Sequence, residues 1–152
     1  MFVGANSLAL DSKGRIAIPA RYREELAVLC QGHLVVTIDT DPCLLIYPAP
    51  TWQKIAEALL RVSTPNAMAK RLRRQLAGNA TEVEMDGQGR ILVAPRLRKL
   101  AGLEKRVMLV GQLNKFELWD EDRWEDQNES WRDEEGPIDT ESMPEELRNL
   151  QL

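Results

Sequence analysis

The sequence LDSKGRIAI at residues 10–18 recurs as MDGQGRILV at residues 85–93. Both copies follow one pattern: an apolar residue, Asp, two variable residues, Gly, Arg, Ile, a variable residue and an apolar residue. In the same register, Arg21 and Arg23 align with Arg96 and Arg98. Because several positions agree on one register, we interpret the chain as an internal duplication. Two small units that each carry an Arg on a tight Gly loop suit a long repetitive polymer better than an enclosed substrate.

The duplication continues beyond the loops. His33–Val35 aligns with Met108–Val110 and, after a shift of three residues, 44–52 aligns with 116–124. We therefore predict one repeat at 5–52, a helical connector at 53–79, a second repeat at 80–124, and an acidic helix and tail at 125–152. Pro19 and Pro95 differ by one position in this register, which leaves open whether the two loops present their Arg side chains identically.

Local patterns predict the elements within each repeat. Period-two apolar residues predict strands at 7–10 and 15–18, and the polar, Gly-containing loop between them is typical of a hairpin. Further strands are expected at 33–39, 44–47, 107–111 and 116–119, and helices at 20–29, 50–62 and 95–101. Another helix should begin with Thr64 as N-cap and Pro65 at its first position. An acidic helix should start near Asp120–Asp122, followed by a linker at 132–137 and a short helix or disordered end at 144–152.

The charge of the chain is unevenly distributed. Residues 120–152 contain 13 acidic and 3 basic residues, a net charge of −10, whereas residues 1–119 contain 17 basic and 11 acidic residues, a net charge of +6. A basic body with an acidic end is compatible with nucleic-acid binding despite the overall charge of −4. We find no apolar run long enough to span a bilayer and no signal peptide, so we expect a protein of the cytoplasm and nucleoid, without a membrane partner.

The sequence gives little support for an enzymatic activity or a metal site. Cys30, His33 and Cys43 are three possible soft ligands, but a structural zinc site needs a fourth. Two cysteines make no disulfide framework, and we expect both thiols to be reduced. His33 is the only histidine, and neither a nucleophile motif nor a pair of carboxylates at meaningful spacing is recognisable. We predict a protein that is not an enzyme and has no metal, cofactor or small-molecule substrate.

The repeated loops are the candidate binding site. Gly permits positive φ, and Asp can accept backbone N–H groups inside the turn, which leaves the Arg as the outward reader of guanine or phosphate. The predicted loop-shaping residues are Asp11, Gly14, Asp86, Gly87 and Gly89. The predicted DNA contacts are Arg15 and Arg90, extended by Lys13, Arg21, Arg23, Arg96 and Arg98. An alternative stays open: Asp11 pairs with Arg15, and Asp86 with Arg90, simply to hold the hairpin.

Two other features have simpler interpretations. The basic run Lys70, Arg71, Arg73 and Arg74 is expected on a solvated helix face. Trp52, Trp119 and Trp124 are expected to pack in the core or between the repeats.

Five stretches carry a resemblance to a known family: residues 11–15, 21–24, 42–48, 85–90 and 114–119. They closely resemble the MraZ family of bacterial transcriptional regulators, which are built from two tandem AbrB-like (SpoVT-AbrB) units. The resemblance covers about residues 1–124 and includes both copies of the family's Asp-x-x-x-Arg motif.

This resemblance implies an α+β, mainly β fold with two tandem AbrB-like units of the swapped-hairpin, looped-hinge type, packed helices, and assembly into octameric or dodecameric rings. It implies a sequence-specific DNA-binding repressor of its own operon, at the head of the division and cell-wall gene cluster. Family members read short G-rich direct repeats in promoter DNA, spaced about one helical turn apart. Arg15 and Arg90 match the family's motif and inherit its DNA-contact role.

An alternative function is a protein-interaction module. AbrB-like folds also occur in antitoxins, whose acidic tails bind a toxin, and the acidic end of this chain fits that class. The same end could instead shield the basic body when DNA is absent.

Overall fold

The computed structural model describes residues 1–62, 66–134 and 141–150. The chain divides into two compact units, Met1–Glu121 and Asp122–Leu152. The first unit contains the first repeat and the second repeat except for its last three predicted residues, 122–124.

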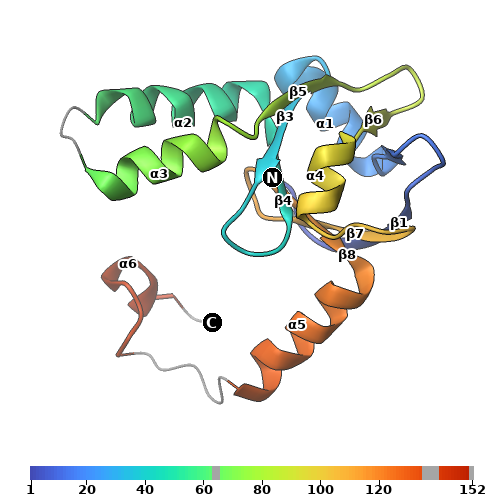
Figure 1. Cartoon of the computed structure of the whole chain (residues 1–152). Helices are drawn as coiled ribbons and strands as arrows, with labels where there is room; N and C mark the ends of the chain where they lie inside the picture. Colours follow the sequence, from blue (N-terminus) through green and yellow to red (C-terminus); the bar gives the residue numbers. More distant parts are fainter. Residues whose placement is uncertain (63–65, 135–140, 151–152) are drawn as a thin grey trace. The chain divides into compact units, whose positions relative to one another are not determined.

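The two repeats contain the same elements in the same order (Figure 1). The first repeat comprises β1 (Ala5–Ala9), β2 (Arg15–Ala17), α1 (Ala20–Cys30), β3 (His33–Ile38) and β4 (Leu44–Pro48). The second comprises β5 (Thr81–Glu84), β6 (Arg90–Leu92), α4 (Pro95–Leu100), β7 (Arg106–Gly111) and β8 (Phe116–Asp120). Between them lie α2 (Ala49–Arg61) and α3 (Ala67–Leu76). The predicted α+β class is confirmed.

Strands from the two repeats are interleaved in antiparallel sheets. The larger sheet has the order β1-β7-β8-β4-β3-β5, and the smaller one pairs β2 with β6. If each strand is replaced by its counterpart in the other repeat, the order of the larger sheet reads the same from the opposite edge. The first unit therefore has an approximate two-fold symmetry that relates its two repeats.

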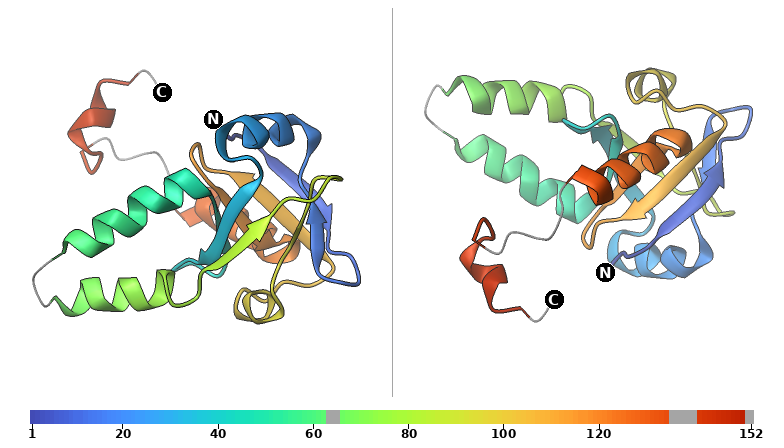
Figure 2. Two further views of the ribbon diagram at one scale, coloured as in Figure 1. Left: turned by 90° about the horizontal axis from the view of Figure 1, so that it is seen from above. Right: turned by 90° about the horizontal axis from the view of Figure 1, so that it is seen from below.

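The predicted hairpin at each Asp loop is wrong. β1 pairs with β7 and β2 pairs with β6, so the loop at 10–14 joins strands of two different sheets. Leu8 and Ile16 follow the period-two pattern that was expected, but a local pattern carries no information about which distant strand supplies the hydrogen bonds. Figure 2 shows β1 and β2 following one another while the yellow β7 runs beside β1.

The alignment of His33 with Met108 is also wrong, by two residues. Ala9 pairs with Arg106, and Glu84, which is the counterpart of Ala9, pairs with His33. His33 therefore corresponds to Arg106. A shift of two residues returns every side chain to the same face of a strand, so the apolar pattern could not reveal it. The alignment of 44–47 with 116–119 is confirmed, because Leu45 and its counterpart Glu117 are direct partners.

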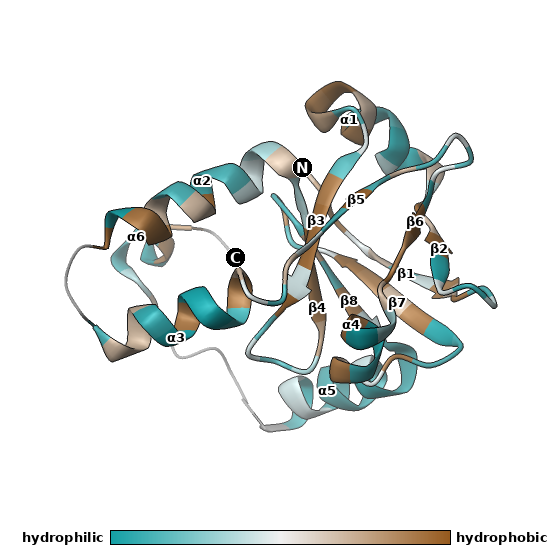
Figure 3. Cartoon of the chain, turned by 45° about the horizontal axis from the view of Figure 1, so that its top comes forward, coloured by the Kyte–Doolittle hydropathy of each residue, from teal (hydrophilic) through white to brown (hydrophobic). Residues whose placement is uncertain are grey.

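One apolar core is built from both repeats, as expected for units too small to bury much surface alone. Ile16, Leu34 and Leu44 from the first repeat join Ile91 and Leu109 from the second, all within 1 % of complete burial. Figure 3 shows hydrophobic, brown stretches along the strands, among them β3 and β7. Trp119 is buried as predicted, whereas Trp52 and Trp124 are only half-buried; Trp52 packs against Tyr47, with 5.9 Å between ring centroids.

The helices α2 and α3 form a helical hairpin beside the sheet (Figures 1 and 2). Both are described over their whole length and contain no fully buried residue; Leu60 and Met68 are 73 % and 69 % exposed. The hydroxyl of the buried Thr37 donates to the Leu76 carbonyl at 2.6 Å, which ties the end of α3 to β3. The basic residues of α3 are exposed, as predicted.

The predicted start of α3 is too early. Asn66 is the N-cap, and its Oδ1 accepts the backbone N–H groups of Met68 and Ala69. Thr64 and Pro65 lie outside the described residues. Asparagine is as good a cap as threonine, so the choice between two neighbouring caps could not be made from propensity.

The second unit contains most of α5 (Glu121–Glu134) and α6 (Glu145–Arg148). The expected start of the acidic helix near Asp120–Asp122 is confirmed. Arg132, Asp133 and Glu134 belong to the helix rather than to the predicted linker, and its other residues, 135–137, lie outside the described ones. Trp124 and Trp131 pack edge to face along α5, with 5.7 Å between ring centroids. None of the described helices has the length and apolarity needed to cross a membrane.

Candidate nucleic-acid interface

Asp11 organises the first loop with both of its carboxylate oxygens. Oδ1 accepts the backbone N–H groups of Lys13 and Arg15, each at 2.9 Å, and Oδ2 accepts Nε of Arg15 at 2.7 Å. The backbone closes the turn, because Asp11 N–H donates to the Arg15 carbonyl and Gly14 N–H donates to the Asp11 carbonyl, both at 3.0 Å. One carboxylate thus fixes the turn and the Arg side chain together.

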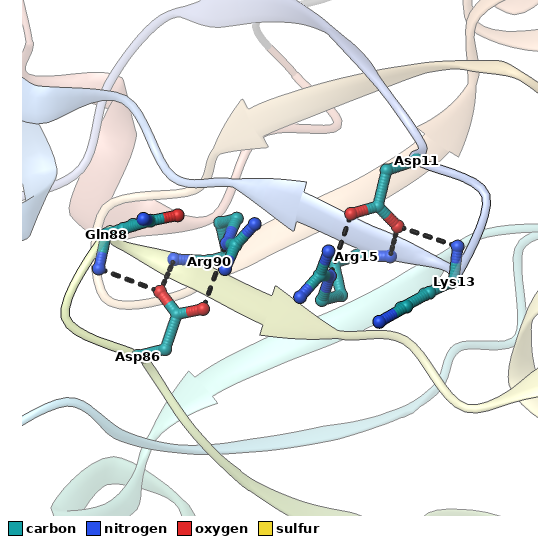
Figure 4. A network of polar contacts seen from close by, with 6 residues as sticks. All are labelled: Asp11, Lys13, Arg15, Asp86, Gln88 and Arg90. Carbon is teal, nitrogen blue, oxygen red and sulfur yellow. Dashed lines mark hydrogen bonds and ion pairs between the residues drawn. The ribbon is translucent and has the colours of Figure 1, made fainter.

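The second loop repeats this arrangement atom for atom. Asp86 Oδ1 accepts the N–H groups of Gln88 and Arg90, and Oδ2 accepts Nε of Arg90, all at 2.9 Å. Figure 4 shows one such pair at each end of the β2–β6 ribbon. The pairing of Asp with Arg that the sequence left open is therefore present in both loops.

Each Asp–Arg pair leaves N–H donors of the guanidinium group available. Arg has five N–H donors, and among the described residues the carboxylate contacts of Arg15 and Arg90 use Nε–H alone. The side chains of Arg15 and Arg90 keep 28 % and 32 % of their surface exposed. Each guanidinium is consequently oriented by its Asp while its terminal nitrogens remain able to bind a ligand.

The carboxylates of both loops are stabilised in the charged form. The backbone N–H of Arg15 is the largest cause that lowers the pKa of Asp11 from 3.8 to about 2, with further contributions from the Arg15 side chain and the Lys13 N–H. The N–H of Arg90 likewise lowers the pKa of Asp86. Both carboxylates are therefore ionised at neutral pH and able to pair with their Arg side chains.

Glycine is required at Gly14 and Gly89, but not at Gly87. Gly14 and Gly89 have φ of +83° and +76°, which side chains rarely tolerate. Gly87 has no positive φ, and a Cβ built on it would meet nothing within 4 Å. Its assignment as a loop-shaping residue therefore has no support in the backbone geometry.

Each loop is contacted by an Arg from the other repeat. A Cβ on Gly14 would lie 2.7 Å from Cζ of Arg98, and a Cβ on Gly89 would lie 2.1 Å from Nε of Arg23. Nε of Arg98 donates to the Val93 carbonyl at 3.1 Å, and Nε of Arg23 donates to the Ile18 carbonyl at 2.6 Å. Both side chains are thus anchored to protein backbone, although they were predicted to extend the DNA-binding surface.

The β2–β6 ribbon places Arg15 and Arg90 on one face. Ile16 pairs with Ile91, and both point into the core. Because side chains alternate along a strand, Arg15 and Arg90 share the opposite face with the exposed Ala17 and Leu92. Arg15 pairs with Leu92 and Arg90 with Ala17, so the two Arg residues are diagonal neighbours, about 7–8 Å apart in a regular sheet.

The remaining predicted contacts are dispersed. Lys13 is exposed in the first loop, and Arg96 is exposed on α4. Arg21 bonds to Asn6 and to the Tyr22 hydroxyl, and its guanidinium lies 4.6 Å from the centre of the Tyr22 ring. Arg21 is therefore engaged with the N-terminal segment rather than with either loop.

The offset between Pro19 and Pro95 leaves the loops alike. Pro19 and Ala94 occupy the same capping position before α1 and α4, with φ of −54° and −55° and ψ of 140° and 141°. Any residue can adopt these angles, so moving the proline by one position changes neither backbone. The backbone that leads out of the two loops is therefore the same in both repeats, despite the shifted proline.

The suspected soft ligands Cys30, His33 and Cys43 do not form a common group in the described part of the chain. Nδ1 of His33 lies 3.2 Å from the Cys30 carbonyl, whereas Cys43 donates to Asp39 Oδ2 at 3.6 Å and lies near Glu117. Burial, followed by the neighbouring carboxylates, raises the pKa of the Cys43 thiol. Asp39 and Glu117 were not anticipated, because only the pairing of β4 with β8 brings Glu117 to this place.

Comparison with known proteins agrees with the duplication. A family described as "MraZ protein, putative antitoxin-like" matches the chain twice, over residues 1–75 and 76–141. A protein of Thioalkalivibrio sulfidiphilus named transcriptional regulator MraZ is 55 % identical over 135 residues, which cover 89 % of this chain and 90 % of that protein. Proteins of the same name from Pseudomonas aeruginosa and Nitrosospira multiformis are 51 % and 52 % identical over the full length of both chains. The chain therefore belongs to the MraZ family.

Proposed function

We propose that this protein is a sequence-specific DNA-binding transcriptional regulator that represses its own operon, at the head of the division and cell-wall gene cluster. The observation that carries the proposal is the pair of Asp-oriented Arg side chains on one face of the β2–β6 ribbon. The names of the curated relatives support the regulatory role.

A two-stranded ribbon has suitable dimensions for the DNA major groove, which is about 12 Å wide. Arg15 and Arg90 would each donate two N–H groups to O6 and N7 of a guanine. Their spacing of about 7–8 Å equals roughly two base steps of 3.4 Å, so both could read one short box. Lys13 and the net charge of +6 on residues 1–119 would strengthen the attraction to phosphates.

We further propose that copies of the chain assemble into an octameric or dodecameric ring that reads direct-repeat promoter boxes. One ribbon offers few base contacts, so each unit should bind weakly. Linking several units raises the overall affinity without adding contacts to any one of them. Boxes about one helical turn apart would present the same groove face to successive subunits.

A salt titration tests the proposal. The probe is the duplex upstream of the chain's own gene, compared with a scrambled duplex, for the wild type and for Arg15→Ala combined with Arg90→Ala. We expect tight, salt-sensitive binding to the native duplex, and its loss in the double variant with the oligomer intact. Arg61→Ala on α2 removes one exposed charge outside the ribbon and should bind like the wild type. Equal affinity for the two duplexes would refute the proposal.

The acidic α5 favours a second candidate function, a protein-interaction module acting through its tail. Asp122, Glu125, Asp126 and Glu129 are exposed on this helix. Truncation after Glu121, which removes these four residues together with the tail, distinguishes their roles: loss of a protein partner with DNA binding unchanged supports the module. A gain in DNA affinity at low salt supports a tail that shields the basic body.

A further inference from the structure

We propose that Arg23 and Arg98 are positioning residues, each of which holds the DNA-contacting loop of the opposite repeat. The inference rests on the proposed function, because it assigns these residues a role in the same interface. It differs from direct DNA contact, the role that their alignment beside the loops suggests.

Arg98, from the second repeat, packs against the first loop. Its Cζ, Nε and Nη2 lie 2.7, 2.9 and 2.9 Å from the place that a Cβ of Gly14 would occupy. Three nearly equal distances indicate that the planar guanidinium covers Gly14 with its face. Its Nε–H is bonded to the Val93 carbonyl, and the Val93 N–H donates to the Gly14 carbonyl at 2.9 Å. Arg98 therefore reaches the first loop by packing and through one shared residue, Val93.

Arg23, from the first repeat, contacts the second loop at the corresponding place, with its Cδ, Nε and Cζ atoms nearest to Gly89. Its Nε, Cδ and Cζ lie 2.1, 2.6 and 2.6 Å from the place of a Cβ on Gly89. Its Nε–H is bonded to the Ile18 carbonyl, and the Ile18 N–H donates to the Gly89 carbonyl at 2.8 Å. The exchange of contacts between the repeats is thus reciprocal.

The position of each contact explains why it would matter for Arg15 and Arg90. Gly14 and Gly89 directly precede these residues, and a glycine is the most flexible point of a loop. Asp11 and Asp86 fix the loop from within its own repeat, while Arg98 and Arg23 cover the glycine from outside. Without that cover, more of the loop's freedom would have to be lost on binding DNA, and affinity would fall.

Double-mutant cycles on the native promoter duplex test the crossed arrangement. Arg98→Ala should lower affinity about 10-fold, the order of one impaired base contact. It should have little further effect once Arg15 is Ala, but its full effect when Arg90 is Ala. Arg23→Ala should show the reverse pattern. Coupling of Arg98 to Arg90 within its own repeat would overturn the inference.

The salt dependence and a Lys variant separate positioning from direct contact. Loss of a phosphate contact reduces the salt slope by about one, whereas loss of a positioning residue should leave the slope unchanged. Arg98→Lys keeps the charge but lacks the planar face and Nε–H, so it should bind as weakly as Arg98→Ala. A reduced slope in Arg98→Ala together with wild-type affinity in Arg98→Lys would overturn the inference.

Amide hydrogen exchange tests the positioning role without DNA. In Arg98→Ala, exchange of Gly14 and Arg15 N–H should accelerate while that of Gly89 and Arg90 stays unchanged, and Arg23→Ala should give the mirror result. Unchanged exchange in both variants would contradict the inference even if the duplex binds as proposed. Crossed acceleration without specific DNA binding would support the positioning role and refute only the proposed function.

Discussion

Ile16 and Ile91 face each other at the centre of the β2–β6 ribbon, and each is the counterpart of the other in the duplicated sequence. The approximate two-fold axis of the first unit therefore passes between them. Both side chains are within 1 % of complete burial, directly beneath the face that carries Arg15 and Arg90. The ribbon that presents the two Arg residues is thus attached to the shared core at its midpoint.

Shortening either isoleucine should destabilise the protein to a similar extent. Ile16→Ala and Ile91→Ala each leave a cavity at equivalent sites, which costs about 2–5 kcal/mol in free energy of unfolding. Because the two side chains are partners, the loss of unfolding free energy in the double variant should differ from the sum of the two single losses. Urea unfolding measures all three, and Leu92→Ala, at a site 50 % exposed, should change stability by less than about 1 kcal/mol. A much smaller effect at one isoleucine would contradict the symmetric arrangement.

Alanine should be tolerated at Gly87 but not at Gly14. At Gly14 it meets Arg98 and a φ of +83°, for which a conformational cost of about 1–3 kcal/mol is expected. Gly87→Ala should change stability by no more than about 0.5 kcal/mol, since open space surrounds its Cβ. Thermal unfolding of Gly14→Ala and Gly87→Ala measures the two losses of stability. Equal destabilisation would show that the two positions have the same backbone requirement.

The hydrogen-bonded structure of the first loop should become less stable in acid. The pKa of Asp11 is lowered in the folded state from 3.8 to about 2, so its contribution to stability is present above pH 4 or so and is lost as the pH falls towards 2. An NMR titration of the Asp11 carboxyl carbon, with the Gly14 amide as a second probe, follows the loss. Asp11→Asn should remove this step from the Gly14 titration. A midpoint near 3.8 in the wild type would show that the loop does not favour the carboxylate.

Removing the cap of α3 should loosen that helix locally. Asn66→Ala eliminates the acceptor of two backbone N–H groups, at a cost of about 1 kcal/mol. Because α2 and α3 bury no residue completely, the loss should accelerate amide exchange in α3 while leaving β3 and β4 unchanged. Asn66→Ser retains a capping oxygen and should exchange nearly as slowly as the wild type. Faster exchange throughout the sheet would mean that α3 unfolds only with the core.

The features that the sequence predicted correctly depend on neighbouring residues. Asp11, Gly14 and Arg15 lie within five positions, so the turn chemistry of each side chain could be read directly. The order of strands and helices followed from periodicity in the same way. The duplication added the equivalence of the two loops, which the atom-for-atom agreement of Asp86 and Arg90 bears out.

The features that were missed depend on residues far apart in the chain. The pairing of β2 with β6, and the packing of Arg98 on Gly14, join positions more than 70 residues apart. In sequence, Arg23 and Arg98 are simply basic residues near a basic loop, and nothing local shows that they face the opposite repeat. The register of His33 was missed because a two-residue shift preserves the burial pattern of a strand.

The first two strands of this protein cannot pair before the second repeat has been synthesised. β1 and β2 find their partners only in β7 and β6, and the roughly 100 residues between β1 and β7 take about 5–20 s to translate. For that interval the nascent first repeat holds Leu8 and Ile16 without their covering strands. A second nascent chain on the same messenger RNA carries identical strands, so chains that emerge side by side are able to exchange halves.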